Sequence, residues 1–348
     1  MLATEPSGVL SPKPDVSPAA VPPAWKQIVA PAEPFLHSVA ERLAAQIQSF
    51  EQDIAVYAEY ALTNQGKQLR PVLVALSGGA AGRPNDGHVM AAVIIEMVHL
   101  ATLVHDDVMD EAQIRRGRPT LAARWGGEIA VLVGDCLFAH ALHLAAGFPT
   151  TEICRAVSSA TNTVCSGEIL QTQQRRQLDM PRAEYFRIIQ MKTGELFALS
   201  CDLGAFLSGA SAPARAALRD FGMAIGTAYQ IYDDCLDLFG SEAAVGKSLG
   251  TDLAKGKLTL PVLLTLERAG GRERDSLREM LAAWNPGRFP ELQASLRRHG
   301  ALDGARAAAH EHLHAAQVHL SALPESECRA SLAALAGFLA RQIDGLVT

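Results

Sequence analysis

Apolar residues recur at steps of three and four along most of this chain. The run Leu36, Val39, Leu43 and Ile47 is an early example, and the pattern continues from about residue 35 to residue 348. Such spacing is the period of one face of an α-helix. Breaks rich in Gly and Pro, as at residues 77–84 and 285–287, separate the segments, and alternating strand patterns are absent. The pattern predicts an all-α fold class with a single domain over residues 35–348.

The first 34 residues have a different character. They hold eight of the 18 prolines of the chain. Proline lacks the backbone N–H that a helix or a sheet ladder needs, so a dense run of it disfavours both. The composition therefore predicts a Pro-rich, disordered arm over residues 1–34.

Composition narrows the classes of function. The net charge is −6 over 348 residues, which argues against binding nucleic acid through a basic surface. No run reaches the ~18 uncharged apolar residues of a membrane span, and no secretory signal precedes the domain. The six cysteines form no CxxC pair and fit reduced core thiols. We expect a cytoplasmic protein without a membrane span, in which anions are held by local cations or metal ions.

An acidic pattern, DDxxD, occurs twice, each time at the end of an apolar helical run. The carboxylates are Asp106, Asp107, Asp110, Asp233, Asp234 and Asp237. Helices that are apolar nearly all round are normally buried, and carboxylates crowded at a buried helix end repel each other unless cations neutralise them. Carboxylates without His or Cys partners select Mg²⁺, or alternatively Mn²⁺. The pattern predicts two helices that face each other across a metal cluster with a bridging diphosphate.

Basic residues surround both acidic patterns. They are Lys67 and Arg70 before the first, Arg115, Arg116 and Arg118 just after it, Lys192 in an apolar segment, and Lys247, Lys255 and Lys257 after the second. One such pair alone would be an ordinary solvated face. Together with the acidic patterns they predict two anion pockets, one held by metal and one by Lys and Arg alone.

Six motifs in a fixed order carry a resemblance to a known family. They are GKQLRP (66–71), HLATLVHDDVMDEAQIRRG (99–117), GEILQ (167–171), KTGELF (192–197), YQIYDDCLD (229–237) and GKSLGTDLAKGKLTLP (246–261). With these motifs the chain resembles the trans-isoprenyl diphosphate synthases, the polyprenyl synthetase family, and most of all their medium- and long-chain members. The resemblance implies an isoprenoid-synthase-type helical bundle, a homodimer, and Mg²⁺-dependent condensation of isopentenyl diphosphate with an allylic diphosphate.

The resemblance also implies roles for single residues. Asp106 and Asp110, supported by Asp107, would hold metal opposite Asp233, with Asp234 and Asp237 nearby. Isopentenyl diphosphate would be held by Lys67, Arg70, His99 and Arg116, and the allylic diphosphate by Arg115, Lys192, Lys257 and Lys247. Thr193 and Gln230 would line the reacting end, where their oxygens face the developing carbocation.

Product length and rival functions depend on fewer residues. In the family that the chain resembles, the hydrocarbon tail grows between helices below the first motif, and short-chain members often carry an aromatic residue about five positions before it. Position 101 is Ala here, and Val98 and Thr102 are also modest in size, so the resemblance implies an open tunnel and a product of C25 or longer for quinone side chains. An Ala101→Phe change should then shorten the product. Candidates for the tunnel floor are Leu137, Phe138 and His140. The alternatives are a short-chain farnesyl or geranylgeranyl diphosphate synthase, a class I terpene cyclase, and a non-catalytic synthase subunit; the complete second DDxxD and the 5% aromatic content disfavour the last two.

Overall fold

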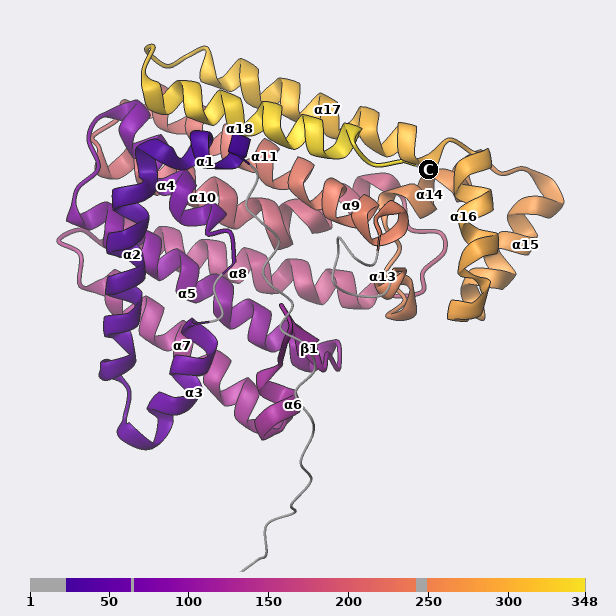
Figure 1. The fold of residues 1–348 in the computed structure, drawn as a ribbon, viewed down its shortest axis with the longest axis horizontal. Coiled ribbons are helices and arrows are strands. Elements are labelled where there is room, and N and C mark those ends of the chain that lie inside the picture. Colours follow the sequence, from indigo (N-terminus) through magenta and orange to yellow (C-terminus); the bar gives the residue numbers. More distant parts are fainter. Residues whose placement is uncertain (1–22, 64–65, 242–248, 348) are drawn as a thin grey trace, which may run out of the picture.

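The protein is a bundle of long α-helices (Figure 1), seen in a computed structural model that describes residues 23–63, 66–241 and 249–347. The first half contains α1 (Pro23–Val29), α2 (Glu33–Gln46), α3 (Gln52–Leu62), α4 (Leu69–Ala81), α5 (Asp86–Met109), the hairpin β1 (Ile114–Arg115) and β2 (Arg118–Pro119), α6 (Leu121–Trp125), α7 (Gly127–Ala146) and α8 (Thr151–Gln173). The second half contains α9 (Arg182–Ile189), α10 (Glu195–Leu207), α11 (Ala212–Phe239), α13 (Thr251–Ala254), α14 (Leu260–Arg268), α15 (Gly271–Ala282), α16 (Phe289–Arg298), α17 (Ala301–Leu320) and α18 (Glu327–Asp344). Short 3₁₀ turns η1 (Ala30–Ala32), η2 (Ile47–Ser49) and η4 (Pro286–Arg288) and a π-helical turn η3 (Gln190–Gly194) complete the order. The predicted all-α fold class is confirmed.

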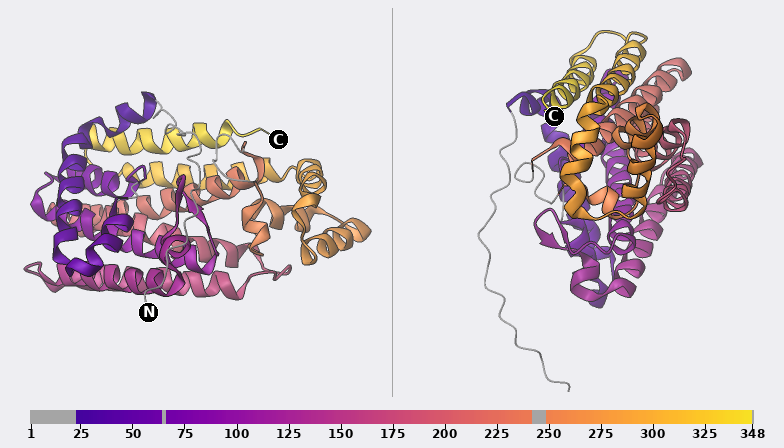
Figure 2. Two further views of the ribbon diagram at one scale, coloured as in Figure 1. Left: turned by 60° about the horizontal axis from the view of Figure 1, so that its bottom comes forward. Right: turned by 90° about the vertical axis from the view of Figure 1, so that its right-hand side faces the viewer.

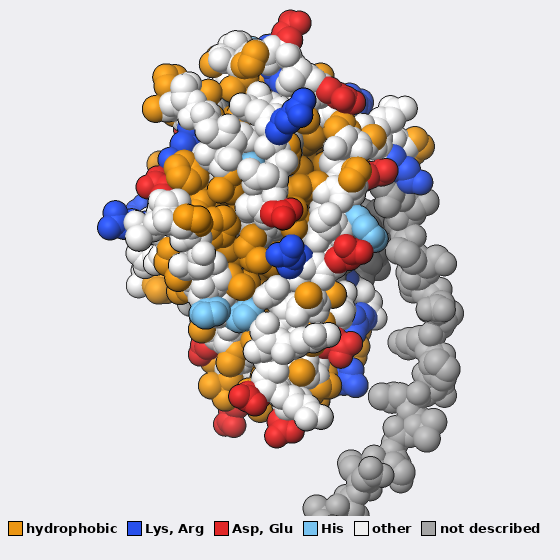
Figure 3. All heavy atoms as spheres, turned by 90° about the vertical axis from the view of Figure 1, so that its left-hand side faces the viewer, with side chains coloured by type: hydrophobic (Ala, Val, Ile, Leu, Met, Phe, Trp, Pro, Cys, Tyr) orange, Lys and Arg blue, Asp and Glu red, His pale blue; other side chains and the backbone are white. Residues whose placement is uncertain are grey.

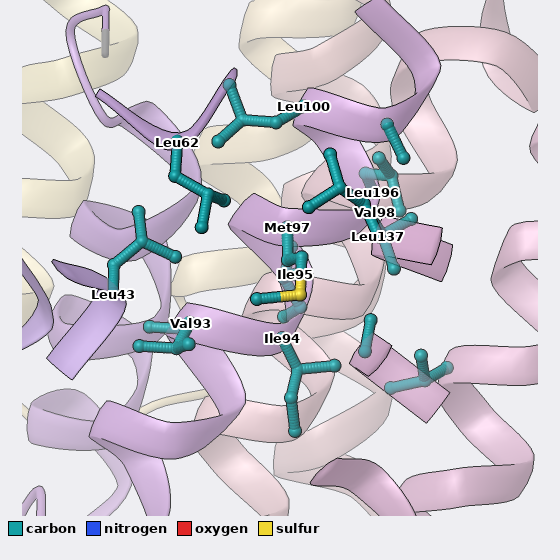
Figure 4. Packing of buried hydrophobic residues seen from close by; sticks show 14 of the residues in the cluster. Leu43, Leu62, Val93, Ile94, Ile95, Met97, Val98, Leu100, Leu137 and Leu196 are labelled. Atoms are coloured by element: carbon teal, nitrogen blue, oxygen red, sulfur yellow. The ribbon is translucent and has the colours of Figure 1, made fainter. Parts of the chain in front are cut away.

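Helix α5 is the centre of the core. Its N-terminus is fixed by a capping box, in which Asn85 and the side chain of His88 bond each other's backbone N–H groups. Three successive residues, Val93, Ile94 and Ile95, are fully buried, so the helix is enclosed on all sides. Side chains from α2, α3, α7 and α10 pack around it (Figure 4). Because α5 cannot shift in this packing, the acidic end of the helix is held in one place.

Helix α11 packs against α10 through two glycines. A Cβ atom on Gly222 would lie 2.5 Å from the carbonyl oxygen of Phe197, and one on Gly226 would lie 2.8 Å from the Cα of Gly194. Only glycine permits backbones to approach so closely. This contact sets the depth at which α11, and the second DDxxD on it, sits beside α10.

The C-terminal helices complete the bundle. Helices α17 and α18 pack against each other along one edge, and α15 and α16 form a smaller layer at one end (Figures 1 and 2). The loop that carries α13 lies against α11 at this end. It brings residues 250–257 to the mouth of the site described below.

Two helices are long and apolar enough to cross a membrane by length and composition, namely α5 and α7. Most of the apolar window of α5, 72%, is buried inside the protein, as expected of a core helix. The window of α7 is only 33% buried, and its Val131 and Leu132 are exposed. Further hydrophobic side chains are exposed in patches between scattered charged ones on the end of the molecule that carries α2 (Figure 3).

The predicted arm over residues 1–34 needs correction. Residues 1–22 lie outside the described residues, but α1, η1 and the start of α2 already form at residues 23–34. The prolines stand where a helix tolerates them: Pro23 opens α1, and Pro31 and Pro34 lie in the first turns of η1 and α2. Trp25 of α1 is buried and packs on Phe338 of α18, with ring centroids 5.7 Å apart. An extended arm as far as residue 34 is therefore wrong for residues 23–34.

We expect Gly222→Ala to destabilise the fold, because the new methyl group would meet a backbone carbonyl oxygen that cannot turn away. Such overpacking costs about 1–3 kcal/mol. Gly337→Ala on α18 is the matched control, since its Cβ would meet only the Arg341 guanidinium at 3.5 Å. Alanine is also the better helix former, by up to about 1 kcal/mol. Urea unfolding followed by circular dichroism should show a lower midpoint for the first variant alone; equal midpoints would contradict the close α10–α11 contact.

Candidate active site

The first aspartate cluster lies at the C-terminal end of α5. Asp106 faces the pocket and pairs with Lys192, at 3.3 Å from carboxylate oxygen to Nζ. Lys192 also contacts Glu168 and donates a hydrogen bond to Oε1 of Gln171 at 3.0 Å. Burial lowers the pKa of Lys192, but Asp106 and Glu168 outweigh it and raise the pKa. Lys192 is therefore a fixed positive charge beside Asp106.

Asp107 turns away from Asp106. Its side chain is 7% exposed, and both of its oxygens accept from Nε of Arg115, at 2.8 and 3.0 Å. Arg115 belongs to the β1–β2 hairpin, whose two-residue turn has Arg116 and Gly117 in the left-handed region, at φ 51° and 75°. Asp107 thus anchors the arginine hairpin to α5, and its contacts give no support to a place among metal ligands.

Asp110 caps α5 and is surrounded by cations. Arg175 Nη2 lies 2.9 Å from Oδ1, while Lys255 and Lys257 Nζ lie 3.1 and 2.8 Å from Oδ2. Burial raises the pKa of Asp110, but Lys257 and Lys255 outweigh it and lower the pKa to about 2. Asp110 is therefore ionised over the whole working range of pH.

The second cluster divides in the same way. Asp233 is exposed and lines the same pocket as Asp106. Asp234 is buried and accepts from Tyr185 at 2.6 Å and from Nε2 of Gln230 at 2.8 Å. Burial raises the pKa of Asp234 well above its usual value. Asp234 therefore orients Gln230 and, like Asp107, has no contact that favours a metal role.

Gln230 connects Asp234 to the reacting end of the pocket. Its Oε1 accepts from the Thr193 hydroxyl at 2.8 Å, so both ends of its amide are fixed. Thr193 and Lys192 lie in the π-helical turn η3, an irregularity common at functional sites. The structure thus brings the predicted residues Lys192, Thr193 and Gln230 together.

Asp237 has a structural partner of its own. Its Oδ1 accepts from the backbone N–H and the hydroxyl of Thr251, at 3.2 and 2.7 Å, and its Oδ2 accepts from the N–H of Asp252 at 3.2 Å. The side chain is only 2% exposed. Asp237 therefore fastens the start of α13, and with it the loop that carries Lys255 and Lys257, to α11.

The predicted cationic group also gathers in the same pocket. Lys67, Arg70, His99 and Arg116 all line it. The Arg70 guanidinium lies over the Phe197 ring at 5.0 Å. Burial, followed by the charges of Arg70 and Arg116, lowers the pKa of His99 well below its usual value, so the imidazole is neutral at pH 7. Arg118 points elsewhere, over the ring of Tyr60.

Gly66 permits the approach of Arg116. A Cβ atom at Gly66 would lie 2.5 Å from Nη2 of Arg116.

The predicted allylic residue Lys247 lies outside the described residues.

Several residues of the site had no predicted role. Glu96 is 3% exposed, lies one turn before His99 on α5 and lines the pocket. Burial raises the pKa of Glu96 above its usual value, although the charges of Arg70 and Arg116 act in the opposite direction. A lone carboxylate within the apolar run of residues 90–104 was the available signal for it. Glu168 and Gln171 stand in the GEILQ motif. No sequence pattern pointed to Arg175 or Tyr185.

The apolar part of the pocket differs from the prediction. The whole pocket has a volume of about 1630 Å³, and Thr102 and Phe138 line it together with Leu103, Val131 and Ile169. Ala101 and Val98 are packed in the core beside the pocket, 0% and 1% exposed, and are not on its wall. The other two floor candidates, Leu137 and His140, are not on the wall either; His140 bonds Gln46 at 3.1 Å. One helical position, from 101 to 102, turns a side chain by 100° and so from the core onto the wall.

Three carboxylates are candidates for metal ligands: Asp106 and Asp233, which line the pocket, and Asp110, which lies one helical turn after Asp106 on the same face of α5. Within the described ranges, no three His, Cys, Asp or Glu side chains gather closely enough to hold an ion by themselves. Mg²⁺ commonly takes one or two carboxylates and completes its shell with water and phosphate oxygens. All-oxygen donors on two helices that line one pocket therefore fit Mg²⁺ that is bound together with a diphosphate.

Comparison with known proteins agrees with this geometry. A family model described as polyprenyl synthetase matches residues 51–293. This chain belongs to the polyprenyl synthetase family. Members of this family are prenyltransferases, and the protein is accordingly a prenyltransferase.

Relatives of this prenyltransferase differ in the product that their names state. A short chain isoprenyl diphosphate synthase of Methanothermobacter thermautotrophicus is 36% identical over 86% of this chain and 94% of its own. An octaprenyl diphosphate synthase of Haemophilus influenzae is 33% identical over 88% and 93%. The crystal structure of a polyprenyl synthase from Caulobacter crescentus, complexed with calcium and isoprenyl diphosphate, superposes with a TM-score of 0.86 at 34% identity, covering 91% of this chain and 97% of that one. The fold prediction of an isoprenoid-synthase-type bundle is confirmed.

We expect Asp110→Asn to lower the stability of the metal-free protein, because Arg175, Lys255 and Lys257 lose their common carboxylate. A pKa lowered from 3.8 to about 2 corresponds to about 2 kcal/mol. A depressed pKa stabilises the fold above the unfolded value, so the difference from wild type should be full above about pH 4 and shrink as pH falls toward 2. Urea unfolding in EDTA between pH 3 and pH 7 measures it.

The matched control for this experiment is Asp303→Asn. Asp303 pairs with Arg306 at 2.8 Å, but its side chain is 78% exposed, and such pairs contribute little. A loss in the control as large as that in Asp110→Asn, or no loss in either, would contradict a special role of the three cations.

Proposed function

We propose that this prenyltransferase condenses isopentenyl diphosphate with an allylic diphosphate primer and makes an all-trans polyprenyl diphosphate of C25 or longer, for isoprenoid and quinone side-chain synthesis. The observation that carries the proposal is that one pocket is lined by a Lys/Arg group, by Asp106 and Asp233 from two helices, and by an apolar wall. Two diphosphates and a growing hydrocarbon tail need those three surfaces in contact with one another.

The two diphosphates occupy different cations in this proposal. Lys192, Lys257 and Arg115 lie at the aspartate end and take the allylic diphosphate, where they draw charge onto the leaving group. Lys67, Arg70, His99 and Arg116 hold isopentenyl diphosphate, and the arginine forks suit its phosphate oxygens. Mg²⁺, or Mn²⁺ in its place, would be held by Asp106, Asp110 and Asp233 and would neutralise charge on the leaving diphosphate.

The residues between these two groups of cations orient polar oxygens toward the reacting carbon atoms. Departure of the allylic diphosphate leaves a delocalised cation, which the double bond of isopentenyl diphosphate attacks. The new cation then loses a proton to the released diphosphate, which restores a double bond in the product. The hydroxyl oxygen of Thr193 and the fixed amide of Gln230 present polar oxygens at that point. Tyr185 and Asp234 hold the amide in this orientation. Their burial also keeps water from the cation.

A long product is supported by the size and the wall of the pocket. Its volume of about 1630 Å³ exceeds the roughly 300–1,000 Å³ that is typical of pockets for small ligands. The wall beyond Asp106 begins with Thr102, a small side chain. The octaprenyl relative favours this reading, and the relative from Methanothermobacter favours a short-chain synthase as the second candidate.

We also propose that the enzyme is a cytoplasmic homodimer. The apolar and largely unburied side of α7, with Val131 and Leu132 exposed, is a surface that a second copy would cover. Isopentenyl diphosphate and allylic diphosphates are its partners, and the net charge of −6 fits no nucleic acid.

We expect the protein to extend farnesyl diphosphate with isopentenyl diphosphate in the presence of Mg²⁺, and EDTA to stop it. Asp106→Ala and Asp233→Ala should each lower turnover about a hundredfold or more, since a metal clamp supplies several kcal/mol and each 1.36 kcal/mol is tenfold. Asp303→Ala, on an exposed pair, is the control that retains turnover. A cyclic product would favour a terpene cyclase, and a folded wild type without turnover would favour a non-catalytic subunit.

We expect Thr102→Phe to shorten the main product by at least one prenyl unit, because the ring would stand on the pocket wall. Ala101→Phe is the matched variant, and the structure changes its expected outcome: a ring at a fully buried position overpacks the core and costs about 1–3 kcal/mol. Chromatographic sizing of the products and thermal unfolding separate the two effects. If only Ala101→Phe shortens the product, the placement of Thr102 on the pocket wall is wrong. A wild-type product of C15 or C20 would favour the short-chain synthase.

A further inference from the structure

Asp110 has two cationic partners that lie outside the diphosphate set proposed above. Arg175 approaches one of its oxygens at 2.9 Å, and Lys255 approaches the other at 3.1 Å, beside Lys257 at 2.8 Å. The Asp110 side chain is only 11% exposed, so these contacts occur in a sheltered place where charge interactions are strong. One carboxylate with three cations leaves a local excess of positive charge.

The backbone holds Arg175 in this position. Arg175 follows the C-cap of α8, Gln174, and its N–H donates to the carbonyl of Thr172 at 3.3 Å. The next residue, Arg176, is in the left-handed region at φ 63° and donates its N–H to the carbonyl of Gly256 at 2.7 Å. Since Gly256 lies between Lys255 and Lys257, this bond ties the end of α8 to the lysine loop.

The guanidinium of Arg175 has donors to spare. Nη2 binds Asp110, but Nε is buried and has no hydrogen-bond partner in the part of the chain that the structure describes. Gln174, the residue before Arg175, and Lys257, which shares Asp110 with Arg175, line the ligand pocket. Buried N–H groups are nearly always paired, so an unpaired one beside that pocket calls for an acceptor that arrives with the ligand. Arginine presents its N–H groups as a fork that matches phosphate oxygens.

We propose that Arg175 is a positioning residue with two successive partners: Asp110 in the empty enzyme, and an oxygen of the allylic diphosphate once Asp110 has turned to the metal. This inference rests on the proposed function. Arg175 then competes with a metal ion that arrives alone, because the ion must break the ion pair. It assists a metal ion that arrives with a diphosphate, because the released guanidinium gains a new anion.

Arg175 thereby couples the two binding events. By linkage, whatever the diphosphate adds to the affinity for metal, the metal adds to the affinity for diphosphate. The enzyme binds its metal and its allylic substrate together, and the empty site resists loading with metal alone.

The test uses Arg175→Gln and two binding measurements without turnover. Mn²⁺ affinity in the absence of any diphosphate is measured from the electron paramagnetic resonance signal of free Mn²⁺, and affinity for labelled inorganic diphosphate is measured by equilibrium dialysis at saturating Mn²⁺. We expect the variant to bind Mn²⁺ alone several-fold more tightly and inorganic diphosphate about tenfold more weakly, as for the loss of a charge-assisted hydrogen bond.

Arg176→Gln is the matched control. It removes the same charge one residue away, and the Arg176 side chain lies on Gly256 and is exposed. Both affinities should stay at wild-type values in this control. Arg175→Lys provides a second variant that keeps the charge: it should retain the resistance to Mn²⁺ alone and lose part of the affinity for diphosphate, because lysine has no fork.

Three outcomes would overturn the inference: no change in Mn²⁺ affinity, no change in diphosphate affinity, or the same changes in Arg176→Gln. Circular dichroism confirms that each variant is folded. The binding readouts need no product, so they separate this inference from the proposed function. If the two affinities shift in opposite directions in a protein that extends no allylic primer, the inference about Arg175 holds and the proposed condensation is wrong. If the enzyme is active but the affinities do not shift, only the inference about Arg175 is wrong.

Discussion

The structure depends on the neutralisation of carboxylates that are crowded at the ends of two long helices. Asp106 pairs with Lys192, Asp107 with Arg115, and Asp110 with Arg175 and two lysines. These five cations come from four different segments: the π-helical turn, the hairpin, the end of α8 and the loop after α13, which supplies both lysines. The acidic end of α5 is thus the point at which distant parts of the chain are bound together, and its carboxylates have cationic partners even without a metal ion.

The two DDxxD motifs place their aspartates at the same spacing, but these aspartates have three different roles. Asp106 and Asp233 are open to the pocket, whereas Asp107 and Asp234 are buried and bond to Arg115 and to Gln230, although Asp234 still borders the pocket. Successive residues of a helix differ by 100° in direction, so two neighbouring aspartates cannot serve one ion from the same face. The inward aspartates hold the residues that touch substrate, and Asp237 holds the loop that completes the site.

Rigid packing beneath the site keeps these contacts in register. α5 is enclosed on every side, and α11 approaches α10 as closely as glycine allows. Neither helix can yield when charges repel or when a diphosphate enters.

The sequence alone determined the all-α class, the helices that end in the two acidic motifs, and the cations that surround them, because period, charge and motif order are local properties. Tertiary structure decided which aspartates are open and that Asp110 meets Lys255, 145 residues further on. It also decided that Thr102 and not Ala101 lies on the pocket wall, since only the position of the neighbouring helices determines which face of α5 borders the pocket. Proline misled at residues 23–34 for a related reason: in the first turn of a helix it removes no hydrogen bond, and only packing against α18 shows that α1 is there.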